Sequence, residues 1–83
     1  MKEVGLISSN PIKIRILELL KKRNEVDIKV ISKSIRIPEF LLKPILNDLK
    51  REGFIIEENG LFKLSSRGLN VLLKKYDIER VRN

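Results

Sequence analysis

Three residues of this chain have the types and spacing best suited to contact another molecule: Lys43, Asn47 and Arg51. They recur every four residues, so they fall on one side of a helix. Lys and Arg can bind phosphates, and an Asn amide can bond to the edge of an adenine base. Phe40 and Pro44 share this side and add apolar surface. This face is therefore predicted to contact either a polyanion or a partner protein.

Catalysis and metal binding have little support. The 83 residues include no His and no Cys, so a metal would need carboxylates alone, and no acidic cluster has ligand spacing. Catalysis by carboxylates or lysines would need a pocket, for which so small a core leaves little room. We therefore expect no enzymatic activity, no metal and no cofactor, and no small-molecule ligand is evident.

Length and composition set further bounds. Eighteen Lys and Arg against eleven Asp and Glu give a net charge of +7, which favours a polyanionic partner, although an ordinary soluble surface can carry as much. The length predicts a single domain over residues 1–83, with a folded core of about 10–76. No apolar run reaches the ~18 residues of a membrane span, and residues 1–9 lack a signal-peptide core. A cytoplasmic location is expected.

The first two helices are marked by their N-caps. Asn10, with Pro11 at the first helical position, predicts a helix that ends in the basic run at residues 21–23, where cations complement the helix dipole. Asp27 predicts the cap of a second helix over about 28–35, whose isoleucines follow helical spacing.

A tight turn at residues 36–37 leads to a third helix, which is predicted to end at Gly53. A start at Pro38 would place Pro44 inside the helix, at a cost of ~3 kcal/mol or a kink. A start near residues 40–41 would place Pro44 in the first turn, and we favour it. The stripe predicted to face the core is Leu42, Ile45, Leu46 and Leu49.

A β-hairpin is predicted around Asn59-Gly60, between the β-prone runs 54–58 and 61–64. Both central positions of a type I′ turn need positive φ, which Asn and Gly tolerate. Ser65 or Ser66 then caps a final helix with a predicted core stripe of Leu69, Leu72, Leu73 and Tyr76. The whole predicted core is Leu17, Leu20, Ile31, Ile35, Leu42, Leu46, Leu49, Ile55, Leu64, Leu69 and Leu72.

In this order and spacing the elements resemble the winged helix-turn-helix superfamily over about residues 10–76, and they are most similar to short archaeal winged-helix regulators. Segment 28–35 looks like the positioning helix, 46–55 like the end of the recognition helix and the entry to the wing, and 62–68 like the junction to the last helix. The resemblance implies an α+β, mainly α fold with three helices, a two-stranded β-wing and a C-terminal helix. It also implies a transcriptional regulator that binds double-stranded DNA with its third helix in the major groove.

The charges depart from this pattern. Residues 39–60 hold three cations and five carboxylates, a net −2, so the rest of the chain carries +9. This distribution favours binding driven mostly by phosphates, with Lys29 among the cations that suit it. The predicted DNA contacts are Lys33, Arg36, Phe40, Lys43, Asn47, Arg51, Lys63 and Arg67. The alternative is a protein-interaction module of a transcription or replication assembly, which docks through Phe40 and Pro44.

A second apolar stripe predicts a homodimer. Val71 and Ile78 lie seven residues apart on the last helix, away from its predicted core stripe, with Val81 near them. Apolar residues near the N-terminus also lack an obvious core position. A stripe of this kind often marks a partner surface, although these residues could instead cover the first helix within one chain. The predicted interface is Val4, Leu6, Ile7, Val71, Ile78 and Val81.

Overall fold

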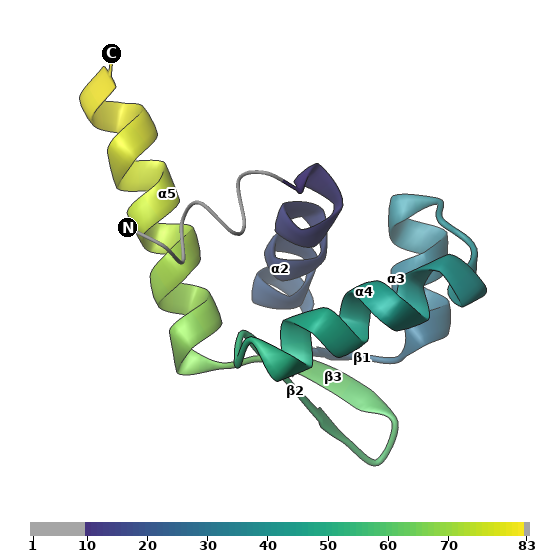
Figure 1. Ribbon diagram of the computed structural model, residues 1–83. Helices are drawn as coiled ribbons and strands as arrows, with labels where there is room; N and C mark the ends of the chain where they lie inside the picture. The colour runs from purple at the N-terminus through teal and green to yellow at the C-terminus, as the bar shows by residue number, and fades with distance from the viewer. Residues whose placement is uncertain (1–9, 83) are drawn as a thin grey trace.

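The computed structural model describes the backbone of residues 10–82 and the side chains of residues 10–74. Within these residues the fold is α+β and mainly helical, with four helices and a three-stranded antiparallel sheet (Figure 1). The elements are α2 (Pro11–Arg23), β1 (Glu25–Val26), α3 (Ile28–Ile35), α4 (Glu39–Arg51), β2 (Ile55–Glu58), β3 (Leu61–Leu64) and α5 (Ser66–Arg82). None of the helices in this part of the chain has the length and apolar character to cross a membrane.

Helix α2 lies at the centre of the molecule. Its predicted cap is confirmed, because the Asn10 side chain accepts hydrogen bonds from the backbone N–H groups of Ile12 (3.1 Å) and Lys13 (3.3 Å). The helix contacts α3, α5, β1 and β3 (Figure 1). It therefore provides the surface on which the other elements pack. Its fully buried apolar side chains are Ile16, Leu17 and Leu20.

The turn after α3 is held by local hydrogen bonds. The helix has the predicted bounds and cap, with the Asp27 carboxylate accepting from the Val30 N–H at 2.9 Å. At its end Arg36 adopts a left-handed conformation, with φ 59° and ψ 47°. The Ile37 N–H donates to the Ser32 carbonyl (3.2 Å), and the Ser32 hydroxyl donates to the Ile37 carbonyl (2.6 Å). These bonds fix the direction in which the chain enters α4.

Helix α4 begins at Glu39, so the favoured start near residues 40–41 was wrong. The physical reason is that the Pro38 carbonyl already accepts the N–H of Leu42, at 3.1 Å, which sets the helical hydrogen-bond pattern. Pro44 consequently lies inside the helix, where it cannot donate a bond to the carbonyl four residues earlier.

The C-terminus of α4 has the predicted glycine stop. Gly53 has a φ of 82° and donates its N–H to the Lys50 carbonyl, while the Phe54 N–H donates to the Leu49 carbonyl, both at 3.0 Å. This pair of bonds satisfies carbonyls that the helix end would otherwise leave open. The core-facing stripe of α4 is confirmed: Leu42, Leu46 and Leu49 are buried and Ile45 is partly buried.

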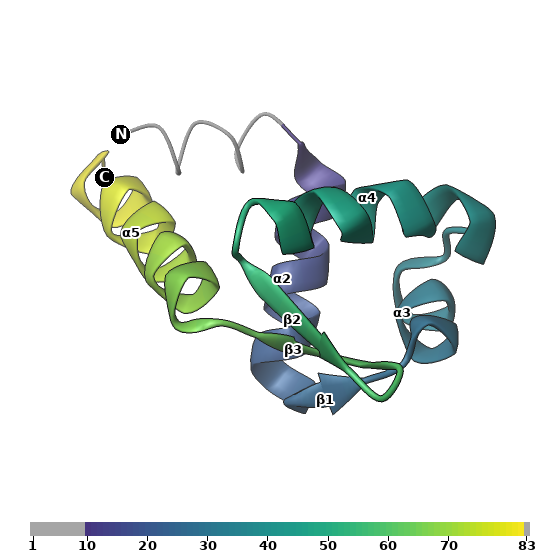
Figure 2. The ribbon, with the colours of Figure 1, turned by 60° about the horizontal axis from the view of Figure 1, so that its bottom comes forward.

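The sheet has three strands where two were predicted. Asn59 and Gly60 have φ values of 53° and 79°, which confirms the hairpin turn. β1 pairs antiparallel with the other side of β3, giving the order β1-β3-β2 (Figure 2). Lys63 on β3 consequently lies between Glu25 on β1 and Ile56 on β2. Because an isolated hairpin is marginally stable, the extra strand supports it.

The predicted core stripe of α5 was right only for Leu72, which is buried. Leu69 and Leu73, expected in the core, are 36% and 44% exposed. Val71, expected at a dimer interface, is buried beside Leu72. The side chain of Tyr76, the last member of the predicted stripe, lies outside the described residues.

Close packing at Gly68 explains this orientation. The Ser65 hydroxyl caps α5 by accepting the Gly68 N–H at 3.0 Å, and the Ser65 N–H donates to the Phe54 carbonyl at 3.1 Å. A Cβ on Gly68 would overlap the Phe54 carbonyl oxygen, so only glycine allows this approach. Val71 and Leu72 follow Gly68 at helical i+3 and i+4 positions, and all three therefore face the core.

Fourteen apolar residues make up the core of the described chain. Leu64, a predicted member, is only partly buried and packs against this core. Among the residues that were not predicted, Phe54 is fully buried. The core residues are Ile16, Leu17, Leu20, Val26, Ile31, Ile35, Leu42, Leu46, Leu49, Phe54, Ile55, Phe62, Val71 and Leu72.

A largely buried ion pair joins α2 to the end of α4. The Lys13 ammonium is within hydrogen-bond distance of both carboxylate oxygens of Glu52, at 3.1 and 3.0 Å. Lys13 is 8% exposed, so its charge has little access to water. The pair therefore fixes the C-terminal end of α4 against the first turn of α2.

Glu52→Ala is expected to lower the free energy of unfolding by about 1–3 kcal/mol, because it leaves the Lys13 ammonium desolvated and without a partner. Asp48→Ala is the matched control: it removes an ion pair with Arg51 on the exposed side of the same helix and should cost less than about 1 kcal/mol. Urea unfolding followed by circular dichroism measures both. Equal losses for the two variants would contradict the importance of burial at Lys13.

Candidate functional site

The outward face of α4 is the largest group of predicted site residues that the structure brings together. All five of the residues expected there are exposed: Phe40, Lys43, Pro44, Asn47 and Arg51. Phe40 is 72% exposed, so its ring is not packed into the core. This face is therefore available to a partner along most of the helix.

Exposed cations that form no ion pair with the described residues lie on α3, the following turn and α4, as they also do at the end of α2 with Lys22 and Arg23. Lys33, Arg36 and Lys43 are exposed, and none forms an ion pair with the described residues. Lys29, one turn before Lys33, is also exposed and also forms no ion pair with the described residues. These four cations, which we call the basic group, keep their full charge for an external anion.

Lys63 on the hairpin and Lys50 at the end of α4 differ from the basic group, because each forms an ion pair with a glutamate of the hairpin. Lys63 forms an ion pair with Glu58 (3.0 Å), and Lys50 at the end of α4 pairs with Glu57 (2.6 Å). The hydrogen bond to Glu58 and its charge, with a smaller effect of Glu25, raise the pKa of Lys63 above its usual 10.5. The free energy that the Lys63 ammonium contributes to folding through this pair is therefore fully present at a pH below the ordinary lysine pKa. It is lost as the pH rises through the raised pKa of Lys63 in the folded chain. Lys63 is thus a weaker candidate for phosphate contact than the basic group.

Two of the three predicted arginine contacts, Arg51 and Arg67, are also engaged within the chain. Arg51 forms an ion pair with Asp48 on the same helix. The Arg67 guanidinium lies over the ring of Phe54, 5.2 Å from its centroid. Arg67 belongs to the start of α5, and its side chain lies beside Gly53, just after the end of α4.

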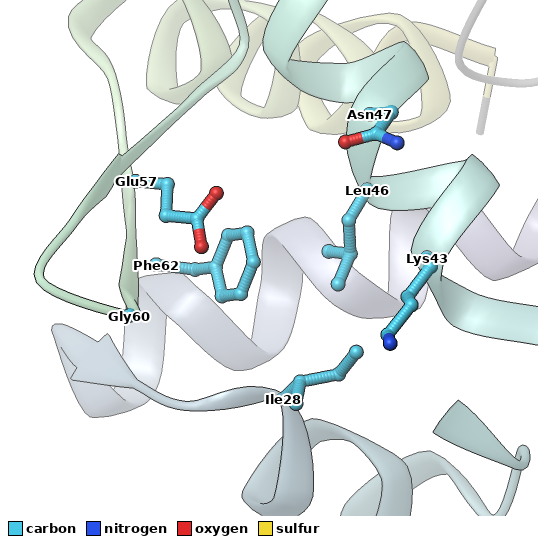
Figure 3. Close-up of a pocket in the computed structure, with 7 residues that line it drawn as sticks. All are labelled: Ile28, Lys43, Leu46, Asn47, Glu57, Gly60 and Phe62. Atoms are coloured by element: carbon cyan, nitrogen blue, oxygen red, sulfur yellow. The ribbon is translucent and has the colours of Figure 1, made fainter. Parts of the chain in front are cut away.

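A pocket of about 320 Å³ lies between the start of α3, the outward side of α4 and the hairpin (Figure 3). Its lining residues are Ile28, Lys43, Leu46, Asn47, Glu57, Gly60 and Phe62. Of these, only Lys43 and Asn47 were predicted site residues. Leu46 lies beside them on α4, whereas the remaining lining residues come from the start of α3 and from the hairpin, and no local pattern in the sequence marks these as neighbours of α4.

The predicted dimer interface changes in the structure. Val71 is removed from it because its side chain is in the core. The other five predicted residues lie outside the described side chains: Val4, Leu6, Ile7, Ile78 and Val81. Leu69 and Leu73, one turn apart on α5, are instead the exposed apolar residues of this helix within residues 66–74.

Neither a metal-binding group nor a known relative indicates what this chain does. Among the described residues, no group of three or more His, Cys, Asp or Glu side chains could hold a metal ion. No known protein family, no curated protein and no solved structure matches this chain. The function is therefore inferred from the charges, exposure and contacts described above.

Proposed function

We propose that this chain is a winged helix-turn-helix transcriptional regulator that binds double-stranded DNA. In this proposal α3 and α4 form the helix-turn-helix, β2 and β3 form the wing, and α4 enters the major groove. The observation that carries it is the basic group, which spans α3, the turn and α4 and is not neutralised within the described chain. Cations that keep their charge release counterions when they contact phosphates, and that release drives binding.

Arg36, in the turn before α4, is exposed and can contact a phosphate there. Glu39 in the first turn of α4 opposes an anion at the start of this helix, so the contact is assigned to the side chain of Arg36 and not to the helix dipole. The hairpin carries Glu57 and Glu58, so we assign it a minor share of the binding. Asn47 is the residue proposed to read a base, because it can bond to adenine in the major groove.

Lys33→Ala and Arg36→Ala are each expected to weaken binding to all DNA sequences alike. Each should also reduce the slope of log affinity against log salt by about 0.9, the contribution of one phosphate contact. Fluorescence anisotropy with labelled duplexes at several salt concentrations measures both effects. Lys74→Ala is the matched control, because Lys74 is an exposed cation on α5, away from the basic group.

The proposal fails if the wild-type chain shows no affinity for duplex DNA at low salt. It also fails if Lys74→Ala changes the slope as much as Lys33→Ala does, since binding would then follow net charge alone. Asn47→Ala tests base recognition separately from phosphate contact. This variant should show a weaker preference among base sequences, while the slope of log affinity against log salt stays unchanged.

The second candidate is a protein-interaction module of a transcription or replication assembly. It is favoured by the exposure of Phe40 and Leu41 at the start of α4, which are 72% and 48% accessible, beside Pro44. Exposed apolar surface of this kind suits a protein groove better than phosphates. Phe40→Ala distinguishes the two: loss of function in a complementation assay, with DNA affinity unchanged, would favour the interaction module.

We further propose that the regulator is a homodimer through α5. Leu69 and Leu73 form an exposed apolar pair on this helix, whose C-terminal end extends away from α2 (Figure 1). A dimer would place two copies of α4 about one DNA turn apart, ~34 Å.

Light scattering at micromolar concentration should give twice the 9.7 kDa mass of the chain. Leu69→Glu combined with Leu73→Glu should reduce the mass to that of one chain, because two carboxylates would be buried in the interface. Asn70→Glu, at an exposed position between them, is the control and should stay dimeric. A monomeric wild type would exclude the dimer.

A further inference from the structure

The pocket beside α4 has opposite charges on two sides and an apolar wall between them. Figure 3 shows Glu57 reaching in from the hairpin and Lys43 reaching in from α4, with Phe62, Leu46 and Ile28 between. Its volume of about 320 Å³ lies at the lower end of the ~300–1,000 Å³ typical of small-molecule sites. A few convergent polar groups on an apolar wall are the usual composition of such a site.

Both charged groups retain bonding capacity. Lys43 forms no ion pair with the described residues, so its three N–H donors are available. Glu57 uses Oε1 to bind the Lys50 ammonium at 2.6 Å, which leaves Oε2 able to accept a further bond. The Asn47 amide adds one donor group and one acceptor at the same opening.

The arrangement of charges limits the class of ligand. Lys43 would repel a simple cation, while the free Oε2 of the paired Glu57 offers an acceptor for an amine. A molecule with one carboxylate and one amine therefore meets a complementary group at each side. An apolar body between the two charges would cover the wall of Ile28, Leu46 and Phe62 and so gain free energy from burial.

We propose that this pocket binds a short apolar peptide, with its C-terminal carboxylate at Lys43 and its N-terminal amine at Glu57. Lys43 and Asn47 are also the proposed DNA contacts of α4. A bound ligand would therefore occupy the groups that DNA needs, and the two would compete. This regulatory half of the inference rests on the proposed function, whereas the ligand site does not.

The test is an NMR titration of the ¹⁵N-labelled full chain with dipeptides of leucine and of phenylalanine at millimolar concentration. Free leucine and phenylalanine are the controls, because their amine and carboxylate are too close together to reach both Lys43 and Glu57. The expected result is saturable shifts of amides around the pocket. Lys43→Gln should weaken binding about tenfold, because a charge-assisted hydrogen bond is lost. Lys33→Gln, a cation outside the pocket, should leave ligand affinity unchanged.

Glu57→Gln should weaken binding about tenfold for ligands that carry an amine and should not affect the corresponding deaminated acids. Lys50→Gln is its matched control: it breaks the same ion pair but keeps the Glu57 carboxylate, so ligand affinity should be retained or increased. If Lys50→Gln and Glu57→Gln weakened binding equally, the effect would come from the hairpin's structure, and the assigned role of Glu57 would be overturned.

The site proposal is overturned if no dipeptide shifts the pocket amides, or if wild type binds amines and deaminated acids equally well. DNA affinity is measured on the same samples without ligand, so the two proposals can fail separately. Saturable ligand binding without DNA affinity would sink the proposed function and leave the site intact. Binding of both without competition would overturn the regulatory half alone.

Discussion

Leu49→Ala is expected to lower the free energy of unfolding by about 2–5 kcal/mol. Leu49 has no exposed surface, lies in the stripe by which α4 packs on the core, and is near the contact of α4 with β2. Removing its side chain loses the transfer free energy of three carbons and leaves a cavity that the close-packed core cannot fill. Urea unfolding followed by circular dichroism gives the difference directly.

Leu41→Ala is the control on the same helix, because Leu41 is 48% exposed. The same three carbons are removed there without opening a cavity, so the loss should be within about 0.5 kcal/mol. If Leu49→Ala cost less than about 1 kcal/mol, or no more than Leu41→Ala, the rotation of α4 about its axis would be wrong. Every surface assigned to this helix would then need to be reassigned.

Gly68→Ala is expected to lower the free energy of unfolding by at least about 2 kcal/mol. The added Cβ would overlap the Phe54 carbonyl oxygen and lie 2.9 Å from Leu64 Cδ1. To remove this overlap, α5 would have to move away from Phe54. That movement would also disturb the hydrogen bond from the Ser65 N–H to the same carbonyl. This cost exceeds the ~1 kcal/mol by which Ala favours a helix over Gly.

Thermal unfolding of Gly68→Ala and of Asn70→Ala tests this packing. Asn70 is exposed on the same helix, so its replacement should change stability by no more than about 0.5 kcal/mol. A Gly68→Ala variant as stable as wild type would show that α5 does not approach Phe54 closely. The core positions of Val71 and Leu72 would then be in doubt as well.

The features that the sequence predicted well are set by a few adjacent residues. Asn59-Gly60 form the hairpin turn because both tolerate positive φ, whatever surrounds them. Asn10 and Asp27 cap helices through bonds to N–H groups two or three residues away. Since the partners are local, the pattern of residue types was sufficient.

The orientation of α5 was not predictable in this way. Apolar side chains stand at Leu69, Val71, Leu72 and Leu73, so two different stripes satisfy helical spacing. The choice between them depends on the approach of Gly68 to Phe54, fourteen residues earlier and in another element. The strand β1 was missed for a related reason: a two-residue strand has no periodicity, and its pairing with β3 exists only in the folded chain.

The candidate site was predicted in part. The spacing along α4 correctly gave the exposed face that holds Lys43 and Asn47. It could not reveal that Glu58 neutralises Lys63, or that Glu57 and Lys43 line one pocket, because these neighbours are far apart or lie on different elements. Which of the eighteen cations stay unpaired is a property of the tertiary structure, and it decides where an anion can bind.

The acidic hairpin has a consequence for how this small molecule behaves at high concentration. With the order β1-β3-β2, strand β2 is a sheet edge that pairs only with β3 among the described strands. An open edge with the exposed apolar Ile56 could pair with the same strand of another molecule. Glu57 and Glu58 place charged side chains at that edge, where each is held in an ion pair, with Lys50 and with Lys63. A second strand that paired there would have to break or desolvate these ion pairs, so the same glutamates that weaken the hairpin as a phosphate contact disfavour edge-to-edge aggregation.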